Sequence, residues 1–262
     1  MTNEGVDSLH SFKAIDEHGD YRDVPLTGER PLTIYLDNRE IVTLMTMGAQ
    51  PELLTLGYLR NQGLVRSIED VIAVQVDWDV EAVAVTTRQQ VENIEVKLSK
   101  RTVTSGCGQG TMFGDVMASL GELNVVCPDF SEEIIYQVLS GLQDYNQMYK
   151  TAGAVHGCAL CSMNGDVDVF VEDVGRHNAV DAISGWMWLE QMSGKNKVFY
   201  TTGRLTSEMV IKVAQMEVPL LLSRSGVTEM GLQIAQKIGI GMVARAKGKH
   251  FLVFNGFERF RR

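Results

Sequence analysis

Basic side chains and long apolar runs are both scarce in this chain, and each scarcity excludes a class of protein. The 262 residues hold 24 Lys and Arg against 33 Asp and Glu, which gives a formal net charge of −9. Binding along a nucleic acid needs a basic face, so we expect no nucleic-acid partner. No apolar run approaches the length that spans a bilayer, and the first residues are polar and acidic. We therefore expect neither a membrane span nor a secretory signal.

Cysteine is scarce as well, since the chain has four. In a sequence this long, four cysteines do not form the disulfide framework of a small secreted protein. They indicate the reducing cytoplasm, where thiols stay free for chemistry. The remaining composition, with 45% hydrophobic and 22% charged residues, is that of an ordinary globular protein. A chain of this length allows one large domain or two smaller ones.

Strand patterns dominate the N-terminal part. Residues 1–30 are polar and rich in turn formers, so we expect a partly ordered lead-in with one or two edge strands. Residues 31–105 are predicted to form the smaller, β-rich α+β domain. It holds strands at 32–36 and 41–46 as one hairpin, a helix from Pro51 to about Asn61, a second hairpin of strands 71–76 and 82–87, and a strand at 91–98.

From residue 106 onward the pattern predicts the main domain, 106–262, with a glycine-rich loop at its start. An amphipathic helix begins at Ser131, and Asn164-Gly165 joins two strands as a hairpin. Predicted helices at 178–192, 206–215 and 227–238 then alternate with strands at 198–202, 220–223, 240–244 and 251–254. Such alternation predicts a mixed sheet with helices on both faces, so the fold class is α/β, or α+β for the whole chain.

One cysteine, Cys107, stands apart because glycines surround it. Gly106, Gly108 and Gly110 make the stretch 102–111 a poor candidate for the interior of a helix or strand. A helix that begins after Thr111 would place this thiol ahead of a helix N-terminus, where a thiolate is favoured. The alternative is an inert cysteine buried in a turn. The flanking glycines favour the reactive thiol.

The densest polar cluster, residues 172–178, lies where a predicted strand gives way to a helix. Sheets of α/β proteins usually place ligands at such turns. Asp173, Arg176, His177 and Asn178 of this cluster could position a polar substrate or move a proton. Helix capping with a salt-bridged corner is the alternative, and the pattern alone leaves both open.

Two further strand-to-helix turns, 202–207 and 223–228, and a basic turn at 245–250 complete the candidate site. A glycine, hydroxyls and a helix N-terminus can receive an anion, although the same residues suit a plain capping turn. Four basic groups within 245–250 suit a phosphate or pyrophosphate, with a solvated hairpin tip as the alternative. Turns at one sheet edge suggest a common groove. The groove candidates outside the 172–178 cluster are Gly203, Arg204, Ser207, Ser223, Arg245, Ala246, Lys247, Gly248, Lys249 and His250.

The residues His156, Cys158 and Cys161 have a spacing that can hold a metal or form a redox pair. However, they lie in a predicted strand, where positions 158 and 161 point to opposite faces. We therefore predict two packed cysteines and no metal site. Zinc deaminases need a His-x-Glu motif, and Cys158 stands where the glutamate would be, so deamination is excluded. Cys127 has no polar neighbours and is predicted to be structural.

These pieces, in this order, resemble the FdhD/NarQ family of formate dehydrogenase accessory sulfurtransferases. The resemblance runs from about Pro31 to Gly256, and its most specific parts are 151–156, 171–181, 202–204 and 207–208. It implies a cytoplasmic homodimer whose main domain is a cytidine-deaminase-like three-layer αβα sandwich. It also implies that a cysteine desulfurase supplies a persulfide, whose sulfur passes to the bis(molybdopterin guanine dinucleotide) molybdenum cofactor of formate dehydrogenase.

The family's Cys-x-x-Cys loop is only half present here. Its first cysteine matches Cys107 and its second falls on Gly110. A persulfide needs one nucleophilic thiolate, so Cys107 is implied to be catalytic. The family's cofactor-binding segment matches 245–250, where Lys247 and His250 replace arginines and lack their bidentate fork. We predict sulfur transfer through Cys107 to a cofactor in the groove, with the formate dehydrogenase catalytic subunit as a partner. The alternative is a cofactor chaperone that has lost the relay.

Overall fold

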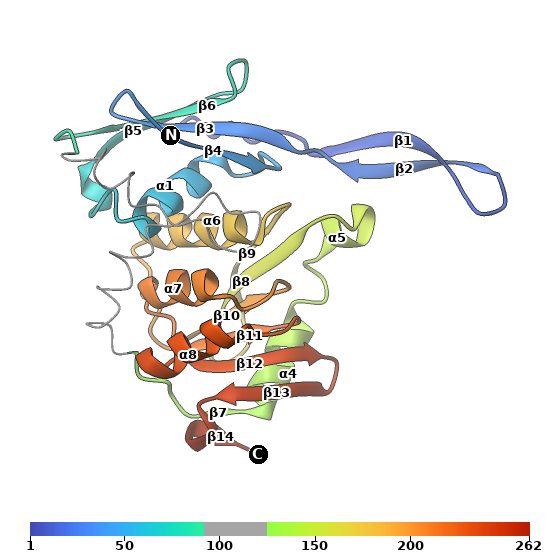
Figure 1. Ribbon diagram of the computed structural model, residues 1–262, viewed down its shortest axis with the longest axis vertical. Coiled ribbons are helices and arrows are strands. Elements are labelled where there is room, and N and C mark those ends of the chain that lie inside the picture. The colour runs from blue at the N-terminus through green and yellow to red at the C-terminus, as the bar shows by residue number, and fades with distance from the viewer. Residues whose placement is uncertain (92–124) are drawn as a thin grey trace.

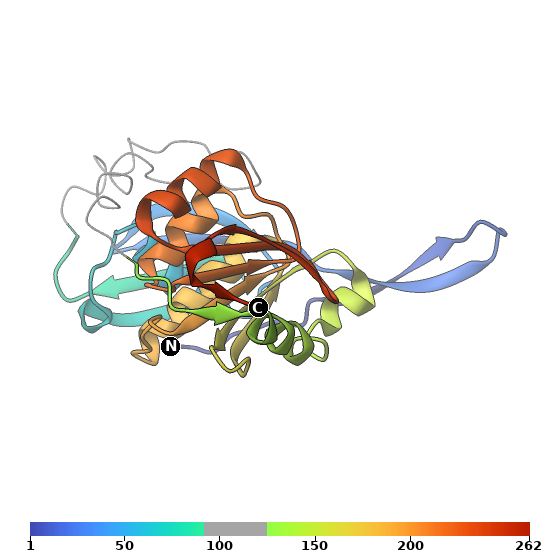
Figure 2. The same cartoon turned by 90° about the horizontal axis from the view of Figure 1, so that it is seen from below.

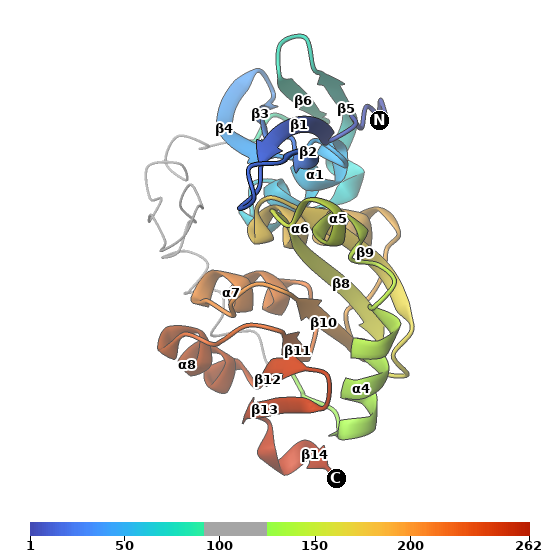
Figure 3. The same cartoon turned by 90° about the vertical axis from the view of Figure 1, so that its right-hand side faces the viewer.

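The computed structural model describes residues 1–91 and 125–262. A smaller and a larger sheet lie on either side of two packed helices, α1 (Pro51–Asn61) and α6 (Arg176–Leu189), as Figure 1 and Figure 3 show. Cys107 and its loop lie outside the described residues, and so do most of the predicted strand 91–98 and the predicted domain boundary at 105. None of the helices in the described parts is long and apolar enough to cross a membrane.

The smaller sheet consists of four strands and confirms both predicted hairpins. Its spatial order is β4-β3-β6-β5, with β3 and β6 parallel in the centre and the two outer pairs antiparallel. Asp37 and Asn38 occupy the β3–β4 turn at φ of 48° and 66°. These left-handed angles suit the twist of a two-residue hairpin. The strands are β3 (Arg30–Leu36), β4 (Arg39–Thr46), β5 (Val71–Asp77) and β6 (Ala82–Thr87).

The larger sheet has six strands and mixed directions, as predicted. Its order is β13-β12-β11-β10-β8-β9, in which β10, β11 and β12 run parallel and the outer pairs are antiparallel. Parallel strands carry their turns to the same edge, so the three strand-to-helix turns of the prediction lie together. The strands are β8 (His156–Ser162), β9 (Val167–Asp173), β10 (Lys197–Thr201), β11 (Leu220–Ser223), β12 (Gly241–Lys247) and β13 (His250–Asn255).

Helices cover both faces of the larger sheet, which confirms the predicted layering. On one face, Leu160 and Phe199 pack in the same core as α6, α7 (Ser207–Gln215) and α8 (Glu229–Ile238). On the other face, Ala159 and Tyr200 pack with α4 (Glu132–Gly141), whose N-cap is Ser131 as predicted. The alternation along each strand divides its side chains between two cores. The predicted helix at 178–192 starts two residues earlier, at Arg176.

Several short elements escaped prediction. They are α5 (Gln147–Ala152), the 3-10 turns η1 (Ile68–Asp70) and η2 (Phe257–Arg259), and the strands β7 (Phe130–Ser131) and β14 (Phe260–Arg261). Strands β7 and β14 pair in parallel and bring the C-terminal end of the chain against the start of α4. Elements of two to six residues are too short to show a readable periodicity, so the pattern could not reveal them.

The predicted edge strands of the lead-in form a projecting arm instead. Strands β1 (Leu9–Ile15) and β2 (Tyr21–Thr27) pair with each other in full register and, among the described residues, with no other strand. The arm extends well beyond the body of the molecule (Figure 1, Figure 2). At its base the Gly28 N–H donates to the Ser8 carbonyl at 2.5 Å. The chain therefore leaves and re-enters the body at one point.

Helices α1 and α6 pack against each other through glycines. A Cβ atom added to Gly57 would lie 1.7 Å from the Asp181 carbonyl oxygen, and one added to Gly185 would lie 2.0 Å from the Leu53 carbonyl oxygen. Both distances are far below van der Waals contact, so only glycine permits this approach. The two backbones are close enough for a side chain at the end of α1, Asn61, to reach the middle of α6.

Candidate functional site

The predicted turns do meet at one edge of the larger sheet. A cavity of about 550 Å³ there is lined by Val174, Thr202, Arg224, Ser225 and Lys247, among others. Each of the four predicted segments contributes at least one of these residues. The sequence-based prediction of a common groove is therefore matched by the fold.

A second cavity of about 810 Å³ continues the first along the β12–β13 turn and α4. Tyr149, Arg224 and Lys247 line both cavities, so the two form one groove. Ala246, Gly248 and Lys249 line the second cavity, and so do Tyr136, the exposed Tyr149 and the almost fully buried Tyr200. Cationic side chains and aromatic rings in one groove suit a ligand that carries both phosphates and flat rings.

A third cavity, of about 220 Å³, lies beside the first. Its lining residues come both from the part of the chain with the smaller sheet and from the part with the larger sheet. His156 and Val174 belong to this cavity and to the 550 Å³ cavity, so the two adjoin. Arg176, His177 and Asn178 line it from the first turn of α6. The other lining residues are Glu29, Leu44, Met45, Tyr58, Gln62, Gly175, Asp181, Glu208 and Lys212.

Asp173, one of the predicted site residues, holds the turn that starts α6. Its carboxylate accepts hydrogen bonds from Thr46 Oγ1 at 2.6 Å, the Gly175 N–H at 2.9 Å and Asn178 Nδ2 at 2.7 Å. The Met47 N–H also donates to it, at 3.2 Å. Burial raises the pKa of Asp173, while these four donors act in the opposite direction. Asp173 thus joins the smaller sheet to α6 beneath the cavities and does not line them.

Gly203 and Ser223 likewise shape the groove from below. Ser223 is fully buried, and its hydroxyl donates to the Gly203 carbonyl at 2.7 Å and accepts from the Ser225 N–H at 2.9 Å. The Gly203 N–H donates to Thr201 Oγ1 at 3.0 Å. A Cβ at Gly203 would come within 2.6 Å of the Arg176 side chain. The absence of a side chain at Gly203 therefore leaves the space that the Arg176 side chain occupies over the turn.

The remaining predicted residues lie at the rim. Arg204 is exposed and Ser207 half-buried at the start of α7, and neither lines the three cavities. Arg245 and His250 are also exposed and outside them. The Arg245 N–H donates to the Ser225 carbonyl at 2.8 Å, which ties the basic turn to the neighbouring turn.

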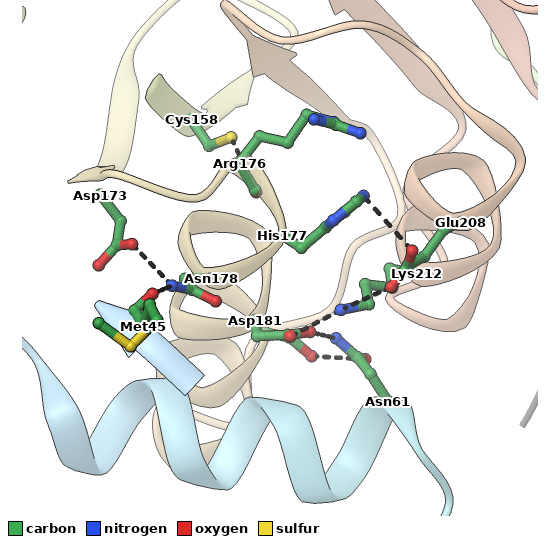
Figure 4. A network of polar contacts seen from close by, with 11 residues as sticks. Met45, Asn61, Cys158, Asp173, Arg176, His177, Asn178, Asp181, Glu208 and Lys212 are labelled. Carbon is green, nitrogen blue, oxygen red and sulfur yellow. Dashed lines mark hydrogen bonds and ion pairs between the residues drawn. The ribbon is translucent and has the colours of Figure 1, made fainter. Parts of the chain in front are cut away.

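The wall of the 220 Å³ cavity holds a buried network of charged groups that joins His177 to residues that the prediction did not assign to the site (Figure 4). Lys212 Nζ is 2.6 Å from Asp181 Oδ2 and 3.6 Å from Glu208 Oε1. Asn61 Nδ2 donates to Asp181 Oδ1 at 2.7 Å. Glu208 Oε2 lies 3.5 Å from His177 Nε2. A lysine four residues after a glutamate on a helix usually marks a surface pair, so the pattern gave no signal of burial.

The two histidines of the site have lowered pKa values. Burial is the main cause at His156, and the charges of Arg176 and Arg204 add to it. Burial also lowers the pKa of His177 to about 3, against the opposing charge of Glu208. Both imidazoles are therefore neutral near pH 7.

The three cysteines of the described residues are all buried, and none is poised for chemistry. Cys158 packs in the core with α6 and Cys161 in the core with α4, which confirms that they point to opposite sheet faces. Burial raises the pKa of both thiols to about 12, and that of Cys127 to about 11. Within residues 1–91 and 125–262, no cluster of His, Cys, Asp and Glu is arranged to hold a metal ion. The prediction for Cys107 falls outside these residues.

Comparison with known proteins agrees with this architecture. The model of the FdhD/NarQ family matches residues 27–261. The chain is 28% identical over 247 residues to the sulfur carrier protein FdhD of Wolinella succinogenes, covering 92% of this chain and 85% of that one. It is 30% identical over 237 residues to the sulfur carrier protein FdhD of Listeria monocytogenes serotype 4b, covering 88% and 89%.

A solved structure extends the comparison to the fold. The crystal structure of a candidate formate dehydrogenase accessory protein from Desulfotalea psychrophila superposes with a TM-score of 0.75 at 27% identity, and the match covers 97% of this chain and 98% of that one. The family model spans nearly the whole chain and includes the three turns and the basic hairpin described above. On this match, the chain belongs to the FdhD/NarQ family.

Proposed function

We propose that this protein is a sulfur carrier that serves formate dehydrogenase, and that Cys107 holds the sulfur as a persulfide. Family membership and the sulfur carriers among its relatives support this function. In the loading step, the Cys107 thiolate attacks the outer sulfur of a persulfide on a cysteine desulfurase. A new S–S bond forms, the donor's S–S bond breaks, and the donor leaves as a thiolate. Sulfur thus changes carrier without an outside oxidant.

The groove is the proposed place for the acceptor, the bis(molybdopterin guanine dinucleotide) molybdenum cofactor, which is cargo and not a resident group. The observation that carries this assignment is the convergence of Arg224, Lys247 and Lys249 with tyrosine rings along one continuous groove. Ammonium and guanidinium groups bind phosphates, and aromatic rings stack on guanine. Gly248, which lines the groove, leaves the basic turn without a side chain at that position, so backbone N–H groups there can approach the cargo.

Intact mass spectrometry tests the sulfur-transfer step. After incubation with a cysteine desulfurase and cysteine, the protein is expected to gain sulfur, and a reductant should remove it. Cys107→Ala should abolish the gain. Cys127→Ala is the matched control, because that thiol is buried with a raised pKa and should not carry sulfur. An adduct that persists in Cys107→Ala would contradict the assignment.

Titration with guanosine diphosphate, as a fragment of the cargo, tests the groove. Replacing Lys247 by alanine is expected to weaken binding by about 10- to 150-fold, because a charge-assisted hydrogen bond contributes about 1.5 to 3 kcal/mol. Lys195→Ala, which alters an exposed lysine away from the three cavities, is the control and should bind like the wild type. Equal loss in both variants would show that only general charge is sensed.

A second candidate function is a cofactor chaperone without sulfur transfer. The observation that favours it is the state of the described thiols: none of Cys127, Cys158 and Cys161 is exposed or has a low pKa. Because Gly110 stands in place of the second loop cysteine, and the thiols of the described residues are buried, none of these thiols is placed to act with Cys107. Guanine-nucleotide binding without any sulfur adduct on the wild-type protein would favour the chaperone.

The resemblance implies four further properties, which we include in the proposal. The protein would act in the cytoplasm as a homodimer, which light scattering of the purified protein tests. It would contact the formate dehydrogenase catalytic subunit directly. Its larger sheet, with α4 on one face and α6 to α8 on the other, would belong to the cytidine-deaminase-like sandwiches.

A further inference from the structure

A buried chain of alternating charges lies along the wall of the 220 Å³ cavity. It runs from Asp181 through Lys212 to Glu208 and ends at His177. The side chains of Asp181 and Lys212 are 2% and 3% exposed, and that of Glu208 is 5% exposed. Charged groups are placed this deep only when each has a partner. Figure 4 shows the four side chains in sequence between α6 and α7.

Lys212 carries the positive charge of this chain. Burial alone would lower its pKa, but the carboxylates of Asp181 and Glu208 raise it above the ordinary value. The ammonium group therefore stays protonated and faces two carboxylates. One Lys212 charge held at 3.6 Å from Glu208 offsets part of the attraction that this carboxylate has for a proton on His177.

Charged and titratable groups face His177 from several elements. Glu208 and Lys212 face it from α7, Arg176 and Asp181 from α6, and His156 from β8, while Glu29 and Tyr58 line the cavity from the smaller unit. Glu208 favours the imidazolium, whereas burial, Lys212, Arg176 and His156 disfavour it. Its Nε2 atom is buried and makes no hydrogen bond within the described residues.

We propose that Lys212 is a positioning residue that holds Glu208 and thereby keeps the imidazole of His177 neutral at the wall of the cavity. His177 then meets the ligand as an uncharged hydrogen-bonding group, and the phosphate-neutralising charges belong to the neighbouring groove. The identity of the ligand in this inference rests on the proposed function. The neutral state of His177 itself does not depend on it.

The test is an NMR titration of the imidazole signals in the free protein. In the wild type, the signal of His177, assigned by its loss in His177→Gln, should stay in its neutral form around pH 6.5, the ordinary pKa of an imidazole. Lys212→Met removes a nearby positive charge, so the Glu208 carboxylate then has His177 as its cationic partner. An opposite charge in contact with an imidazole raises its pKa by about 1 to 3. The pKa of His177 read from its signal should therefore rise by about that amount in this variant. Lys212→Arg should retain the wild-type behaviour.

A second variant guards against misfolding. Lys212→Met leaves Asp181 without its cation, so the pair Asp181→Asn with Lys212→Met removes both charges and should show the same rise at His177. A wild-type His177 that titrates near 6.5, its ordinary value, would overturn the proposal. An unchanged His177 signal in the folded double variant would also overturn it. The titration needs no sulfur donor, so its failure is separate from a failure of the persulfide measurement.

Discussion

Replacing Gly57 by alanine tests whether the close contact of α1 and α6 holds the site together. In ordinary exposed helices this change is stabilising by about 1 kcal/mol, because alanine favours the helix. Here the new methyl group would lie 1.7 Å from a backbone oxygen of α6, which cannot rotate away as a flexible side chain could. The helices must move apart. The expected effect on stability therefore has the opposite sign from the helix propensity.

The magnitude follows from two losses. Overpacking of a close contact costs about 1 to 3 kcal/mol, and weakening the buried hydrogen bond from Asn61 to Asp181 costs about 1 to 3 kcal/mol more. After the propensity gain of about 1 kcal/mol is subtracted, the free energy of unfolding should fall by about 1 to 5 kcal/mol. For a chain of this size, that corresponds to a Tm lower by roughly 2 to 20 °C.

Thermal unfolding followed by circular dichroism measures this change. Gly226→Ala is the matched control, since a Cβ there meets nothing within 4 Å and its stability should hardly change. Urea unfolding of both variants gives the free energies directly. A Gly57→Ala variant as stable as the wild type, or more stable, would refute the tight helix contact and with it the geometry of the Asp181 network.

Three other predictions concern the thiols, Asp173 and pH. Native Cys107→Ala should react slowly with a thiol reagent at pH 8, because burial raises the other thiol pKa values to about 11 to 12; fast reaction of any remaining thiol would contradict this. Asp173→Asn should lose about 2 to 3 kcal/mol of stability in urea, because an amide cannot replace both acceptor oxygens, while unchanged stability would count against the four-bond turn. His177 has a pKa below its unfolded value, so the unfolded state binds its proton first and stability should fall as the pH drops from 6.5 towards 3. His177→Gln should flatten that slope in urea unfolding at several pH values, and an identical slope would exclude His177 as the cause.

The hydrophobic pattern predicted most of the fold, because long elements repeat their periodicity. The helix from Pro51 to Asn61 and the strand Leu220–Ser223 have the predicted bounds. The groove followed from a general property of parallel strands, whose turns share one sheet edge. Local pattern and topology were sufficient in these cases.

What the pattern could not predict depends on partners distant in sequence. Lys212 looks like a surface lysine until Asp181 of another helix supplies its counter-charge. Asp173 looked like a ligand-binding group, although its donors Thr46 and Met47 lie on a strand end far earlier in the chain. Tertiary contacts of this kind leave no trace in a window of neighbouring residues.

The arm formed by β1 and β2 also has a consequence for chain connectivity. Because Ser8 and Gly28 are hydrogen-bonded at its base, the arm is an insertion between two adjacent points of the body. Exchanging it for a short turn changes the entropy of loop closure by only about 1 to 2 kcal/mol, since that entropy grows with the logarithm of length. The match to the family model begins at residue 27, where the arm ends. The body can therefore keep its fold while the arm varies in length and sequence independently of it.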